Sequence, residues 1–214
     1  MSPSKYPIPA AQNTVELEIK RSRFICHVQH TPSAESAKNF IAEIKQQFSE
    51  ATHNCWAYQA GPPGDSRLIG CSDDGEPHGT AGKPMLNILL HAKVGELTAV
   101  VTRYYGGVKL GTGGLSRAYA DAVKLALESL MVTEKVCYQQ FFLDTGYSHW
   151  PQVEILLNQY QAVNINAQYS DRVTVTFELD AQNLKSFEQN FINLTSGMGK
   201  LIELEKEHNA SVRP

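Results

Sequence analysis

The strongest constraint on the fold lies in residues 101–119, where an apolar, strand-like run leads through a glycine-rich loop into an amphipathic helix pattern. The loop contains five glycines within nine positions, namely Gly106, Gly107, Gly111, Gly113 and Gly114. Glycine permits positive φ angles and lets another molecule approach the backbone closely. The unpaired N–H groups and the positive dipole end of a helix N-terminus favour an anion. The segment therefore predicts a strand, loop and helix with an anion site at the loop.

Basic side chains flank this loop. Arg103, Lys109 and Arg117 lie in or beside it, and positions 97–120 contain no Asp or Glu. The whole chain has a net charge of -3, while residues 1–134 contain 13 basic and 13 acidic side chains. The molecule as a whole therefore does not attract nucleic acid or anionic membranes, and nucleic-acid binding would have to use this local patch.

The glycine loop does not fit the standard nucleotide-binding patterns. Gly106 and Gly111 have the Walker spacing, but Thr112 and Gly113 follow in place of the required lysine and hydroxyl residue. The dinucleotide pattern fails as well, because Ser116 occupies the position of its third glycine. Anion binding needs only free N–H groups and nearby cations, so neither mismatch excludes it. The alternative is that the glycines only make a tight connection between strand and helix.

A second glycine loop, at residues 79–83, precedes another apolar helix pattern at 85–92. Thr80, Gly82 and Lys83 are therefore candidates for a second phosphate contact at a helix N-terminus. Together with residues 106–114, this loop predicts one anion site between two helices.

Three carboxylates in the preceding turn, Asp73, Asp74 and Glu76, leave two interpretations open. They could hold Mg²⁺ beside a phosphate, or they could cap the glycine-rich turn through backbone hydrogen bonds. The EF-hand spacing is absent, which favours the caps. A zinc set would need His53, Cys55, Cys71 and His78, whose spacing matches no compact zinc motif. We expect no metal and no cofactor.

Hydrophobic periodicity predicts an α+β protein of two domains, 1–134 and 135–214. In the first domain, strands are predicted at 14–18, 22–29, 54–59, 67–71 and 97–104, with helices beginning at Thr31-Pro32, at Met85 and after the glycine loop. In the second, the predicted elements are strand 136–143, helix 150–160, strands 163–169 and 172–179, helix 184–194 and strand 200–205. This β-α-β-β-α-β order is that of a ferredoxin-like sandwich.

Four cysteines without a CxxC pair and an N-terminus without a secretion-signal pattern favour a cytoplasmic protein with reduced thiols. The apolar runs are too short to cross a membrane, so we expect no membrane association.

The chain contains KRSRF (20–24), ATHNCWAY (51–58), DDGEP (73–77), GTAGKP (79–84) and RYYGGVKLGTGGL (103–115), in that order. Together these motifs resemble the YigZ/IMPACT family over residues 14–130, and the remainder resembles the C-terminal domain of bacterial YigZ members. The resemblance implies an N-terminal α/β sandwich similar to domain IV of elongation factor G and a C-terminal domain similar to its domain V.

The resemblance also implies nucleic-acid binding, which has been inferred from that similarity, and a link to translation. The eukaryotic IMPACT protein regulates translation by competing for the activator of a stress-responsive initiation-factor kinase. It uses an extra N-terminal domain for other contacts, so we do not carry its kinase-pathway role over to this chain. The family offers no catalytic residue to carry over.

The leading hypothesis is a non-enzymatic RNA- or ribosome-associated protein, with translation regulation as its biological role. Its anion and nucleic-acid site would comprise Lys20, Arg21, Arg23, Thr80, Gly82, Lys83, Arg103, Tyr105, Gly106, Gly107, Lys109, Gly111, Thr112, Gly113, Gly114 and Arg117. The alternative is a metal-assisted enzyme acting on a phosphorylated small molecule or nucleotide. A third hypothesis is a protein-interaction module whose partner binds the acidic domain 135–214.

Overall fold

The computed structural model describes residues 5–204, and its contacts divide the chain into two compact units, Met1–Lys135 and Val136–Pro214. We call them the N-terminal and C-terminal units and describe each by itself. Both combine sheets with helices, so the mixed α and β class expected from the sequence is confirmed.

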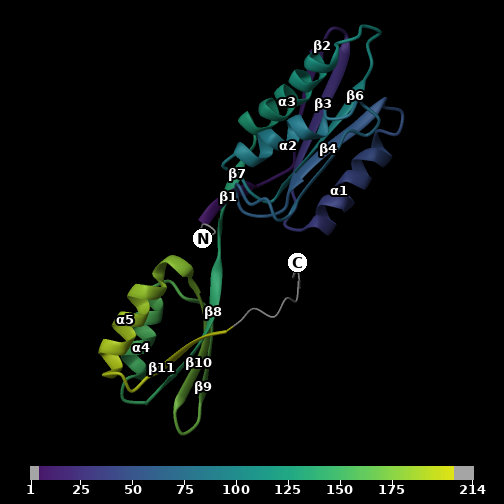
Figure 1. Ribbon diagram of the computed structural model, residues 1–214. Helices are drawn as coiled ribbons and strands as arrows, with labels where there is room; N and C mark the ends of the chain where they lie inside the picture. Colours follow the sequence, from purple (N-terminus) through teal and green to yellow (C-terminus); the bar gives the residue numbers. More distant parts are fainter. Residues whose placement is uncertain (1–4, 205–214) are drawn as a thin grey trace. The chain divides into compact units, whose positions relative to one another are not determined.

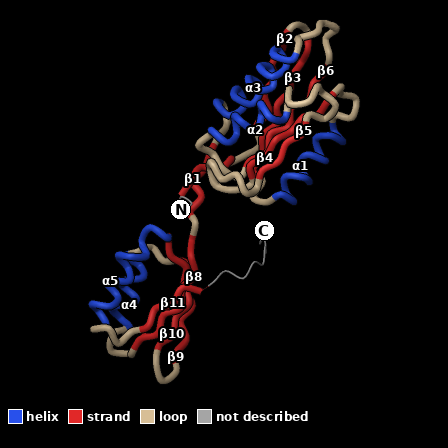
Figure 2. Tube along the Cα trace, viewed as in Figure 1, coloured by secondary structure: helices blue, strands red, loops and turns tan. Residues whose placement is uncertain are grey.

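An antiparallel five-stranded sheet forms the centre of the N-terminal unit, with strand order β2-β3-β6-β4-β5. Its strands are β2 (Asn13–Ile19), β3 (Ser22–His30), β4 (His53–Gln59), β5 (Ile69–Ser72) and β6 (Leu97–Tyr104). The helices are α1 (Ala34–Gln47), α2 (Gly82–His91) and α3 (Thr112–Glu128). Helices α2 and α3 cover one face of the sheet and α1 covers the other (Figures 1 and 2).

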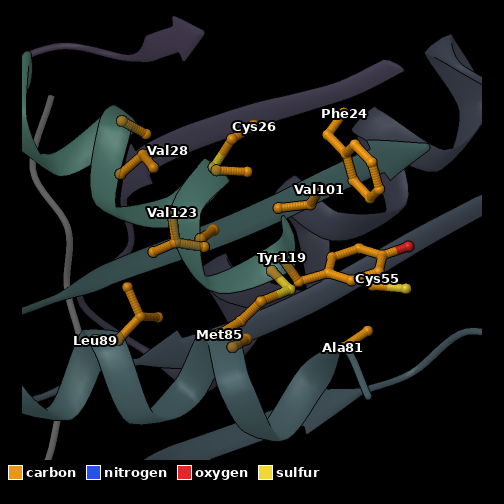
Figure 3. Close-up of a cluster of buried hydrophobic side chains, with 14 of the residues drawn as sticks. Phe24, Cys26, Val28, Cys55, Ala81, Met85, Leu89, Val101, Tyr119 and Val123 are labelled. Carbon is orange, nitrogen blue, oxygen red and sulfur yellow. The ribbon is translucent and has the colours of Figure 1, made fainter. Parts of the chain in front are cut away.

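The central strand β6 explains why this sheet is covered on both faces. Its first seven residues are all buried, and successive side chains point to opposite faces. Val101 packs in the core under α2 and α3, together with Met85 and Tyr119 (Figure 3), whereas Val100 packs against α1. A nearly unbroken run of apolar and β-branched side chains is typical of a strand buried in this way.

Several element boundaries differ from the prediction. Helix α1 begins after Ser33, because Ser33 and Ser36 form a capping box, and the hydroxyl of Thr31 instead pairs with that of buried Thr98 at 2.7 Å. A two-stranded sheet of β1 (Lys5–Pro9) and β7 (Val132–Val136) was not predicted. Short strands without clear alternation leave little pattern to detect.

The C-terminal unit contains β8 (Tyr138–Thr145), α4 (Trp150–Gln159), β9 (Val163–Tyr169), β10 (Val173–Asp180), the 3₁₀ turn η1 (Ala181–Asn183), α5 (Leu184–Thr195) and β11 (Lys200–Leu204). Its antiparallel sheet has the order β11-β8-β10-β9. The two helices pack on one face through a core that includes Phe141, Phe177 and Phe187. The predicted β-α-β-β-α-β element order is confirmed, although residue 205 of its last strand lies outside the described residues.

No helix among the described residues is long and apolar enough to cross a bilayer.

Buried Glu96 ties three segments of the N-terminal unit together. Its carboxylate accepts hydrogen bonds from Tyr6 at 2.8 Å and from Lys135 at 2.5 Å, and it lies 2.8 Å from Nε2 of His30. Burial is the largest single influence and works to raise the Glu96 pKa, but the bonds from His30, Lys135 and Tyr6 outweigh it and bring the pKa to about 2. The ionised carboxylate therefore stabilises the fold.

We expect this network to make the protein sensitive to acid. Because the folded pKa of Glu96 is about 2 and the ordinary pKa of a glutamate is 4.5, its stabilisation is present above pH 4.5 and is lost as the pH falls toward 2. The difference corresponds to about 3 kcal/mol. Urea unfolding at a series of pH values measures it, with Glu96→Gln as the control that cannot titrate. Parallel pH curves for the two proteins would contradict this assignment.

Candidate functional site

Two loops from distant parts of the sequence meet at one end of the central sheet. The turn between β2 and β3 lies against Gly106, since a Cβ on that glycine would fall 2.0 Å from the carbonyl carbon and oxygen of Arg21. The Gly106 N–H also donates to the hydroxyl of Ser22 at 3.1 Å. Both loops are visible at the same end of the N-terminal unit (Figure 1). We call the exposed Lys20, Arg21 and Lys109 on these two loops the cationic rim.

The turn at Lys20-Arg21 is conformationally unusual. Both residues have positive φ angles, 48° and 65°. A two-residue hairpin turn with this geometry normally uses Asn-Gly or Asp-Gly, because other side chains are strained there. Two long cations held in this conformation point to a functional role for the turn.

The N-terminus of α3 is open, as the anion hypothesis requires. Its N-cap is Gly111, with φ 74°, which has no side chain to satisfy the first-turn N–H groups. An added Cβ on Gly111 or on Gly113 would meet no atom within 4 Å. Among residues 5–204, no side chain accepts a hydrogen bond from the N–H groups of Thr112 or Gly113. This helix end therefore has both the N–H donors and the space for an anion.

The N-terminus of α2 is different, and the prediction for it needs correction. The Asp73 carboxylate accepts hydrogen bonds from the backbone N–H groups of Gly79, Ala81 and Gly82 at 2.8 to 3.0 Å. Burial, the largest influence, works to raise the Asp73 pKa, but these N–H bonds outweigh it and the pKa is lowered. A protein carboxylate thus occupies the place where a phosphate was expected.

Thr80 and Gly82 have internal roles in place of the predicted phosphate contacts. Thr80 is buried and its hydroxyl donates to the carbonyl of Pro77 at 2.7 Å. A Cβ on Gly82 would lie 2.8 Å from the backbone of Ser72, so this glycine allows α2 and β5 to pack closely. Lys83 is exposed, and its phosphate contact stays a prediction. The site between two helices reduces to a site at α3.

The carboxylates expected either to bind metal or to cap the turn are occupied by protein groups. Asp74 accepts from Lys45 at 2.5 Å and from the backbone N–H of Asn54 at 2.7 Å. Burial works to raise the Asp74 pKa, but these bonds lower it overall. Within the described residues, no three His, Cys, Asp or Glu side chains are placed to share a metal ion. The capping interpretation therefore fits Asp73 and Asp74 better than the Mg²⁺ interpretation.

Cys55, which entered the zinc hypothesis, is a buried thiol that donates to the carbonyl of Asp73 at 2.9 Å. Burial raises its pKa to about 12. A thiol that stays protonated is a poor nucleophile and a poor metal ligand.

Arg103 requires the most consequential correction. It is only 5% exposed, and its Nη1 donates to Oε1 of Glu76 at 2.5 Å. The hydroxyl of Tyr119 donates to the same oxygen at 2.8 Å, and Nε2 of His53 lies 3.9 Å from it. The guanidinium also lies over the ring of Tyr105, 5.5 Å from its centroid. Arg103 therefore belongs to a buried ion pair and is not an exposed phosphate contact.

A pocket of about 390 Å³ connects this ion pair to the open end of α3. It is lined by Thr52, His53, Glu76, Pro77, Arg103, Tyr105, Lys109, Leu110, Gly111, Thr112 and Leu115. Its volume falls within the range typical of small-ligand sites, and such sites combine apolar walls with a few convergent polar groups. We call it the α3 pocket.

Two groups in the α3 pocket have unused hydrogen-bonding capacity. The Nε of Arg103 is buried and has no hydrogen-bond partner among the described residues. All hydrogen bonds that Glu76 accepts within residues 5–204 go to Oε1. Buried polar groups normally find partners, so the free Oε2 of Glu76 marks this pocket as a candidate ligand site.

The other predicted site residues remain at the surface. Arg23 forms a two-pronged salt bridge with Glu16 at 2.8 and 2.9 Å, which partly neutralises it. Tyr105 is 46% exposed and Arg117 is exposed on α3, so both keep their predicted roles as hypotheses.

Sequence reasoning missed the contribution of Thr52, His53 and Tyr119 to the site. Thr52 accepts from the backbone N–H of Tyr105 at 3.1 Å, and His53 Nδ1 lies 2.8 Å from the carbonyl of Asp74. The ring of Tyr119 packs in the core, but a buried tyrosine hydroxyl needs a partner. That requirement was the one sequence clue to a buried polar group beneath α3.

The fold and the site together define a class of α+β protein in which a glycine-loop pocket opens beside a cationic turn. The Impact N-terminal domain family matches residues 20–127, and a domain of unknown function, DUF1949, matches residues 143–198. The chain belongs to the YigZ/IMPACT family.

Relatives along most of the chain are bacterial. The IMPACT family member YigZ of Escherichia coli is 43% identical over 93% of this chain and 98% of its own length, and YvyE of Bacillus subtilis is 37% identical over 91% of each. Protein IMPACT of Mus musculus is 30% identical over 51% of this chain and 35% of its own length. A solved structure described as a hypothetical protein has 42% identity and a TM-score of 0.69, covering 97% of this chain and all of its own.

Proposed function

We propose that this protein is a non-enzymatic RNA- or ribosome-associated factor of the translation machinery that binds phosphate backbone at the cationic rim. The observation that carries the proposal is the meeting of Lys20 and Arg21 with the glycine loop around Gly106. Cations from two loops thereby share one surface, and the glycines let a backbone approach closely. The similarity to two adjacent domains of elongation factor G and a cytoplasmic location belong to this proposal.

Three features support nucleic acid as the ligand. Among the described residues, no acidic side chain forms a salt bridge with a rim cation, whereas Arg23 is paired with Glu16. Tyr105 presents an exposed ring beside them, which suits stacking with an unpaired base. The rim also lies in the unit that the Impact N-terminal domain family matches. The metal-assisted enzyme is less well supported, because Asp73 and Asp74 are occupied by protein groups.

Charge reversal at the rim tests the proposal. We expect Lys109→Glu to weaken binding to a structured RNA or to ribosomes by about tenfold at low salt and to flatten the dependence of log K on log salt by about one unit. Fluorescence anisotropy at several salt concentrations measures both quantities. Lys38→Glu is the matched control, because Lys38 is also exposed but lies on α1, on the opposite face of the sheet.

The two variants together decide the assignment. Weaker binding by Lys109→Glu alone supports the rim. Equal losses in both variants would indicate a nonspecific charge effect, and unchanged binding in Lys109→Glu would remove the rim from the proposal.

A further inference from the structure

The α3 pocket combines features that point to a ligand more specific than a polynucleotide backbone. It is lined by the N-terminal residues Gly111 and Thr112 of α3, by Lys109, and by the buried Arg103. An RNA backbone following the rim would use exposed cations and would leave Oε2 of Glu76 without a hydrogen-bond donor. The proposed function therefore does not account for the pocket.

We propose that the α3 pocket binds a phosphate monoester, with the phosphate at the N-terminus of α3. Helix N–H groups and a neighbouring lysine are a recurrent phosphate cradle in proteins. The Glu76 carboxylate largely neutralises Arg103, so the net positive character of the pocket comes from Lys109 and the helix dipole. That charge suits one phosphate group better than a polyphosphate.

The remainder of the ligand is a hydroxyl-bearing organic group. Glu76 offers an unused acceptor oxygen, Oε2, at the inner wall of the pocket, which fits the O–H donor of a sugar hydroxyl. The carbonyl of Asp74 can only accept a hydrogen bond, so Nδ1 of His53 carries the proton. This bond sets the orientation of the His53 ring. The exposed ring of Tyr105 at the pocket wall can stack on a base.

A nucleoside 5′-monophosphate satisfies these requirements, and the same group occurs at the 5′ end of an RNA. The shared chemistry is a ribose 5′-phosphate, available either as a free nucleotide or as an RNA terminus. Both sources would place the phosphate at Thr112 and the ribose toward Glu76 and Arg103. The pocket shares Lys109 with the rim, but this inference requires neither Lys20 nor Arg21.

The test is an NMR titration with adenosine 5′-monophosphate at millimolar concentration, with adenosine as the control ligand. We expect the nucleotide to shift the amide signals of Thr112 and Gly113 and the side-chain Nε–H signal of Arg103. Adenosine should shift them much less. No shift at these three signals with the nucleotide would overturn the proposal.

Substitution at Thr112 provides a variant that should fold. Thr112→Glu places a carboxylate at the α3 N-terminus, which the helix dipole favours, so its melting temperature should be equal to or above that of the natural protein. The carboxylate would compete with the phosphate and lower nucleotide affinity at least tenfold. Thr112→Gln is the neutral control of the same size, and the difference in affinity between the two variants measures the effect of the added charge. Equal affinity in both variants would contradict a phosphate at this helix end.

RNA oligomers distinguish the two sources and separate this proposal from the proposed function. The ligand is an RNA terminus if a 5′-phosphorylated oligomer binds more tightly than its 5′-hydroxyl form and also shifts the Arg103 signal. If only the free nucleotide shifts these signals, the ligand is a metabolite. The pocket proposal then holds even if variants of the rim leave RNA binding unchanged. If both oligomers bind equally and no pocket signal shifts, the proposal of a phosphate site in the pocket is wrong, and the proposal of RNA binding at the rim is unaffected.

Discussion

Gly106→Ala is expected to destabilise the N-terminal unit by roughly 3 kcal/mol. The added Cβ would lie 2.0 Å from the carbonyl carbon and oxygen of Arg21 and 2.6 Å from the backbone nitrogen of Ser22. These are backbone atoms of a tight hairpin turn, so no side-chain rotation can relieve the contact. The turn must move away from the glycine loop, and the bond from the Gly106 N–H to the Ser22 hydroxyl would be lost. Urea unfolding measures the change in the free energy of unfolding.

The neighbouring glycines provide the control. Gly113 lies in the first turn of α3, and a Cβ there would meet no atom within 4 Å. Gly113→Ala should therefore stabilise the protein by about 0.5 to 1 kcal/mol, since alanine loses less backbone entropy in a helix. A loss of stability at Gly113 equal to that at Gly106 would mean that general loop flexibility, and not the contact with Arg21, requires the glycine.

This contrast shows how far a sequence can assign roles to glycines. The cluster of five predicted a loop and a helix start, and both are present. Which glycine faces protein backbone and which faces open space depends on β2 and β3, more than 80 positions away. No local pattern contains that information. The strand β6 was predicted with its observed bounds, because its own apolar run indicates a buried strand.

The charged residues show the same limit. Asp73 and Arg103 were both read from their local sequence, one as a metal ligand or turn cap and the other as a phosphate contact. Asp73 reaches the α2 N-terminus six to nine residues away, a distance within the range of a local cap. The partner of Arg103 is 27 residues away in another loop, so the burial of Arg103 could not be inferred from the charge pattern of the glycine loop.

Arg103→Met is expected to cost about 3 to 5 kcal/mol of folding free energy, because it leaves the Glu76 carboxylate buried without its cation. Methionine keeps much of the side-chain volume, so the loss reflects the charge and its hydrogen bonds more than a cavity. Glu76→Gln should also destabilise, since it leaves the guanidinium of Arg103 buried without its carboxylate. Urea unfolding of each variant measures these losses.

The double variant Arg103→Met with Glu76→Gln tests whether the two groups act as a pair. Once both charges are absent, neither is left uncompensated, and Tyr119 can still donate to the amide oxygen of the glutamine. We expect the double variant to be more stable than the sum of the single losses predicts, by about 1 to 3 kcal/mol. Additive losses would show that Arg103 stabilises the fold mainly through its contacts with the rings of Phe24 and Tyr105. In that case the carboxylate of Glu76 would not be the group that holds Arg103 in the wall of the α3 pocket.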